Sequence, residues 1–138
     1  MARDSDGDLV FAAAGAVPHA IDPLHAEAFG LLQGAKMASN LGIGRAKFAT
    51  DSQLLKQALT SSSYDLSRLG ALVSEIKFVL EKFFIEVVID YVPRLVNKPA
   101  HCLAALGLAG VRHDHQVWYE HVPDVVSRAL YGDSAVQV

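Results

Sequence analysis

Cysteine is almost missing from this sequence. Cys102 is the single cysteine among 138 residues, so the chain cannot form an internal disulfide. A chain of this length buries a sizeable core without such a crosslink. A lone thiol fits a reducing compartment, and the length fits one domain.

Long apolar runs and an excess of positive charge are missing as well. Charged residues interrupt every apolar stretch, so none reaches the roughly 20 residues that a membrane span needs. The acidic start of the chain does not resemble a signal peptide, and we therefore expect no membrane contact and a cytoplasmic or nuclear location. The net charge of −3 argues against strong general attraction to phosphate backbones. A mean hydropathy of +0.25 fits burial of apolar surface against a partner.

Apolar periodicity predicts the element order strand, helix, strand, helix, helix, strand, helix. Asp-Gly before the first apolar run indicates a hairpin turn, and Asp22-Pro23 is typical of a helix start. The predicted elements are strand Leu9–Ala14, a helix from Pro23 to about Gly42, strand Arg45–Thr50, helix Ser52–Leu59, helix Leu66–Phe83, strand Ile85–Val92 and a helix from Asn97 to Gly107 or Gly110. Strands separated by helices imply parallel pairing in an α/β fold.

Three segments carry residues that suit chemistry. The first, His25-Ala26-Glu27-Ala28, puts a carboxylate in the first turn of a helix, and the second, Ala49-Thr50-Asp51-Ser52, puts one at the tip of a strand. The third runs from Val92-Pro93-Arg94 through Asn97 to His101 and Ala104. Ligands of parallel sheets gather beyond the carboxyl ends of the strands, where two carboxylates could bind Mg²⁺ or Mn²⁺. Taken without any further signal, Glu27 and Asp51 fit better as solvated acids at a helix start and a strand end.

Taken in order, these segments resemble the ribonuclease H-like superfamily, most closely the plant branch related to the reverse-transcriptase-associated ribonuclease H domain. The resemblance covers about Arg3 to Gly107. It implies that Glu27 and Asp51 are catalytic, metal-binding carboxylates and that His101 stands where many active members have a fourth acid. It also implies that Arg94, Asn97 and Ser52 lie beside the substrate.

The sequence departs from this family pattern at its start. The family begins with a strand whose aspartate bridges two metal ions, whereas Arg3 to Gly7 match the end of the second family strand. We therefore expect a truncated ribonuclease H-like fold: a small, mostly parallel sheet of about three strands, packed with helices, in which Leu9–Ala14 lies beside Arg45–Thr50. We expect this domain to cover residues 1–110, followed by a tail over 111–138 with a short helix from Pro123 to Leu130.

Loss of the bridging acid predicts a noncatalytic module that acts through protein contacts and binds nucleic acid weakly. Glu27 and Asp51 would then be vestigial, because a two-metal mechanism needs several anions acting together. No cofactor would be required. An exposed sheet edge predicts a homodimer or another protein partner. The alternative is an RNA·DNA-hybrid endoribonuclease that uses Glu27, Asp51 and Mg²⁺ or Mn²⁺.

Overall fold

The computed structural model describes residues 1–14, 22–61, 69–109, 116–119 and 121–129. These residues belong to two compact units, one made of Met1–Pro18 with Arg94–Val138 and the other of His19–Pro93. This division differs from the predicted domain over 1–110 followed by a tail. The first residues of the helix predicted from Leu66 lie outside the described residues.

The unit His19–Pro93 begins with the longest helix, α1 (Pro23–Asn40). Asp22 caps it, since its Oδ1 accepts a hydrogen bond of 2.8 Å from the backbone N–H of His25. Gly42 follows its end with φ of 80°, a left-handed conformation that favours glycine. The predicted start and stop of this helix are both confirmed.

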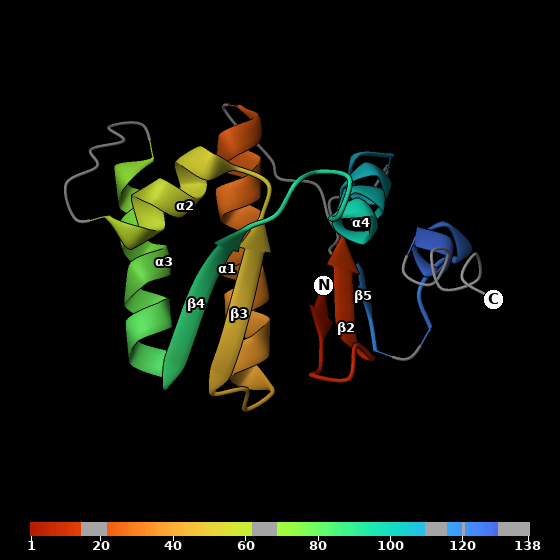
Figure 1. Ribbon diagram of the computed structural model, residues 1–138, viewed down its shortest axis with the longest axis horizontal. Helices are drawn as coiled ribbons and strands as arrows, with labels where there is room; N and C mark the ends of the chain where they lie inside the picture. The colour runs from red at the N-terminus through yellow and green to blue at the C-terminus, as the bar shows by residue number, and fades with distance from the viewer. Residues whose placement is uncertain (15–21, 62–68, 110–115, 120, 130–138) are drawn as a thin grey trace. The chain divides into compact units, whose positions relative to one another are not determined.

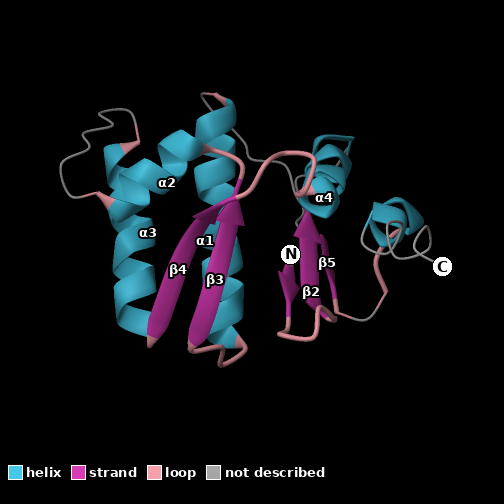
Figure 2. Ribbon diagram, viewed as in Figure 1, coloured by secondary structure: helices cyan, strands magenta, loops and turns pink. Residues whose placement is uncertain are grey.

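The same unit contains a two-stranded parallel sheet (Figure 1). Strand β3 (Arg45–Thr50) pairs with β4 (Glu86–Tyr91) without a register shift. Two further helices, α2 (Gln53–Thr60) and α3 (Gly70–Phe83), complete the unit. In Figure 2, α1 lies behind the two strands and α3 lies on the side of β4. Leu32, Leu55 and Ile76 are fully buried.

The other unit contains an antiparallel sheet in the order β1-β2-β5. β1 (Ala2–Arg3) joins β2 (Leu9–Ala14) through the predicted hairpin turn, in which Gly7 has φ of 89°. β5 (Gln116–Trp118) pairs with the other edge of β2. α4 (Lys98–Ala109) and a short helix over 124–129 add Leu103 and Val126 to a core cluster with Ala12.

The α/β class and the order of elements are confirmed, but the expected pairing of Leu9–Ala14 with Arg45–Thr50 is wrong. β2 has β1 on one edge and β5 on the other, so neither edge is free for β3. The described strands therefore form two small sheets instead of one three-stranded parallel sheet. None of the helices in the described ranges is long and apolar enough to cross a membrane.

Candidate functional site

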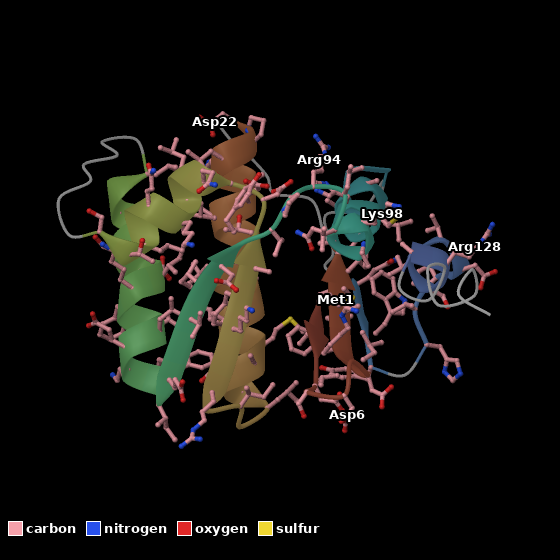
Figure 3. The ribbon with its side chains drawn as sticks, in the orientation of Figure 1. Met1, Asp6, Asp22, Arg94, Lys98 and Arg128 are labelled. Carbon is pink, nitrogen blue, oxygen red and sulfur yellow. The ribbon has the colours of Figure 1, made fainter. Side chains whose placement is uncertain are left out.

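Glu27 and Asp51 lie in the same compact unit and at the same end of it. Glu27 is the fifth residue of α1, whose start is marked by Asp22 in Figure 3, and Asp51 directly follows β3. The first turn of α1 contains no acid, so the expected place of Glu27 in that turn is wrong. The start of α1 and the arrowheads of β3 and β4 share one end of the unit in Figure 1. Both acids are half-buried, and neither is without an interaction partner. The backbone thus places both carboxylates at the carboxyl end of the parallel strands.

Local hydrogen bonds determine the turn that carries Asp51. Thr50, which is only 6% exposed, accepts a hydrogen bond of 3.1 Å at its Oγ1 from the backbone N–H of Ser52. Ser52 in turn caps α2, because its Oγ accepts a hydrogen bond of 3.1 Å from the N–H of Leu55. Asp51 is therefore held between a strand end and a helix start. The role of Ser52 in binding substrate stays a prediction, and the interaction observed for its side chain is the helix cap.

A further acid, Asp90, lies one strand away on β4, opposite Ala49. Its Oδ2 is 2.6 Å from Nζ of Lys47 on β3. The hydrogen bond from Lys47 is the main cause that lowers the pKa of Asp90, and the positive charges of Lys47 and Lys56 add to it against an opposing effect of desolvation. The sequence reasoning missed Asp90, although its position near the end of a predicted strand was a signal that could have found it.

The other predicted site residues lie in the second compact unit, at the start of α4. Arg94 is exposed, and its carbonyl oxygen accepts a hydrogen bond of 3.1 Å from the N–H of Asn97. The carbonyl oxygen of Asn97 accepts one of 3.2 Å from the N–H of His101. Figure 3 labels Arg94 and Lys98 on this segment. These contacts bring Arg94, Asn97 and His101 together in one turn and helix start, while Glu27 and Asp51 belong to the other unit.

The described acids do not provide a two-metal ligand set. Within the described ranges, no group of three or more histidine, cysteine, aspartate or glutamate side chains is placed to hold a metal ion. Two dications need several anionic ligands, whereas Asp90 is paired with a lysine. The arrangement provides an ion pair near the strand tips, and we derive no metal-dependent step from it.

Comparisons with known proteins find a matching family and a similar solved structure. A family model described as reverse transcriptase-like matches residues 1–107. Among solved structures, the ribonuclease H1 of the halophilic archaeon Halobacterium salinarum NRC-1 is similar, with 28% sequence identity and a TM-score of 0.56. The match covers 61% of this chain and 64% of that chain, so this chain spans less than two thirds of its length. Curated protein sequences gave no match.

Proposed function

The chain belongs to the reverse transcriptase-like family of ribonuclease H-like domains, and from this premise we propose that it is a noncatalytic module that acts through contacts with other proteins. RNA·DNA hybrid would bind it weakly, and no metal cofactor would be needed for its action. The observation that carries the proposal is the ion pair between Lys47 and Asp90.

This ion pair reduces the negative charge that a metal ion would encounter near the strand tips. In a two-metal nuclease, acids at the strand tips concentrate dications and align the attacking water. Here Lys47 neutralises Asp90 at one strand tip, and Lys56 adds a second positive charge near that acid. Glu27 and Asp51 are then the two family-matched acids at this end of the unit. Because the parts of such a site act together, a reduced set of anions lowers hydrolysis by orders of magnitude.

The proposed mode of action follows from the small parallel sheet. A two-stranded sheet leaves backbone N–H and C=O groups along its outer edges, and such edges favour pairing with another strand. We infer that the partner is a protein, because the net charge of −3 gives no general attraction to nucleic acid.

The second candidate function is hydrolysis of the RNA strand of an RNA·DNA hybrid. It is favoured by the similarity to a ribonuclease H1 and by the location of Glu27 and Asp51 at one end of their unit. Under this alternative the two acids would bind Mg²⁺ or Mn²⁺ directly. His101, Arg94 and Asn97 would contact or position the hybrid.

A cleavage assay separates the two functions. The purified chain is incubated with a hybrid whose RNA strand is labelled, in Mg²⁺ and separately in Mn²⁺, beside the double variant Glu27→Gln/Asp51→Asn. We expect no cleavage above the level of this variant. Cleavage by the original chain that the double variant loses would overturn the noncatalytic proposal. Binding of the hybrid that falls with salt, without cleavage, would instead indicate a nucleic-acid-binding module.

A further inference from the structure

The edge of β3 that faces away from β4 has no strand paired with it in the described part of the chain. The carbonyl oxygens of Gly44 and Thr50 accept hydrogen bonds from the N–H groups of Glu86 and Val92, at 3.2 and 2.9 Å. Because alternate residues of a strand point their backbone groups to opposite edges, those of Arg45, Lys47 and Ala49 point away from β4. Within the described residues, β3 pairs with β4 alone.

The described part of the chain offers no strand that suits this edge. β2 is long enough, but both of its edges are taken by β1 and β5. β1 has two residues and β5 has three, whereas β3 has six. We therefore consider a second copy of the chain as the source of a matching strand.

We propose that β3 of a second copy pairs with this edge in antiparallel fashion, with Phe48 on the two-fold axis. This inference rests on the proposed function and names the partner. In this register Arg45 lies opposite Asp51 of the second copy, and Lys47 lies opposite its Ala49. Two oppositely charged pairs result by symmetry, which is a favourable cross-strand arrangement. The small side chain of Ala49 leaves the ion pair between Lys47 and Asp90 undisturbed.

The charges on β3 distinguish this register from the others. Centring the axis on Ala49 puts Lys47 opposite Asp51 of the second copy, but Lys47 already pairs with Asp90. Centring the axis on Lys47 puts the two copies of this lysine opposite each other, and centring it on Ala46 puts Arg45 opposite Lys47. Both arrangements bring like charges together, which destabilises an antiparallel pair. The register centred on Phe48 avoids this repulsion. It also juxtaposes Ala46 and Thr50 on the opposite face, where Phe48 makes an edge-to-face contact of 5.7 Å with Phe84 of its own chain.

Of the two longer helices of this unit, α1 lies nearer to β3. It lies behind this strand in Figure 1, while α3 lies toward β4. The buried residues of α1 include Ala28, Leu32 and Ala38. Gly30 is exposed on the opposite face by helical periodicity, whereas Gly34 is partly buried and lies close to the face of Ala38. A Cβ atom added to either glycine would meet no other atom within 4 Å.

Sedimentation equilibrium of the whole chain tests the association and its charge pairing. We expect a dimer at micromolar concentrations, and Arg45→Asp should raise the dissociation constant about tenfold because it repels Asp51 of the second copy at two symmetric positions. The double variant Arg45→Asp/Asp51→Arg should restore it. Glu86→Gln is the matched control, since it removes only the in-chain partner that lies 3.8 Å from Arg45. Circular dichroism verifies that every variant is folded.

Cysteine crosslinking tests the register directly. In a Cys102→Ser background, a mixture of the Lys47→Cys and Ala49→Cys chains should form a covalent dimer with a short thiol crosslinker, and each chain alone should not. A stable monomer, or crosslinking of the Lys47→Cys chain with itself at equal yield, would overturn the inference. A monomer that also fails to cleave hybrid would leave the noncatalytic proposal standing, whereas specific cleavage would overturn that proposal whatever the oligomeric state.

Discussion

At the scale of single residues, the pair formed by Lys47 and Asp90 links stability to pH. The pKa of Asp90 is lowered in the folded chain, mainly by the hydrogen bond from Lys47. A lowered carboxyl pKa stabilises the fold above the ordinary value of about 3.9 and loses this contribution as the pH falls through the folded pKa. We therefore expect Asp90→Asn to reduce the free energy of unfolding by a constant amount above about pH 5 and by less below about pH 4. Urea unfolding between pH 2.5 and 7 measures this difference, and a difference that grows toward low pH would contradict the assignment.

The residues that the sequence predicts well are those whose role is local. Asp22, Ser52 and Gly42 act within a few residues of their own positions. Their helix-cap and helix-stop signals can therefore be recognised from the sequence alone. Asp90 is different, because its partner Lys47 lies on a neighbouring strand and is 43 positions away along the chain (90 − 47). Only the parallel register brings the two together. The charge state at the strand tips therefore could not be predicted from the sequence.

At the scale of elements, the longer helices and strands depend on local sequence, whereas β5 depends on a distant part of the chain. α1, β3 and β4 were predictable from periodicity and β-branched composition, but a strand of three residues gives too short a pattern. β5 exists because β2 offers it an edge, and Trp118 then packs against the cluster of Ala12, Leu103 and Val126. Residues near the carboxyl end of the chain thus complete a core that starts at its amino end.

The short helix over 124–129 provides a test of this packing. Val126 is fully buried, so Val126→Ala should lower the free energy of unfolding by about 2 kcal/mol through loss of buried volume. Val125 beside it is 47% exposed, and Val125→Ala should change stability by less than about 0.5 kcal/mol. Urea denaturation followed by tryptophan fluorescence compares the two, since Trp118 belongs to the same cluster. Equal effects of the two substitutions would show that the short helix does not contribute to this core.

At the scale of the whole molecule, the chain passes between its two compact units twice, near residues 18 and 93. The family resemblance predicted the α/β class, but it did not predict this division, which depends on β1 and β5 occupying both edges of β2. Each unit has buried side chains of its own, such as Leu103 in one and Ile76 in the other. Separate cores imply that each unit opens with its own free energy.

Hydrogen exchange resolves these local stabilities. Leu103→Ala should speed exchange of the β2 amides about a hundredfold and leave those of β3 and β4 nearly unchanged, because a buried leucine truncation costs about 3 kcal/mol in its own core. Ile76→Ala should have the reverse effect, with faster exchange in β3 and β4. The two variants serve as controls for each other, since both remove a buried aliphatic side chain of similar size. If either substitution speeds exchange equally in both sheets, the two units unfold as one. The β3 edge proposed for dimerisation would then be stabilised by the core around Leu103 as much as by the core around Ile76.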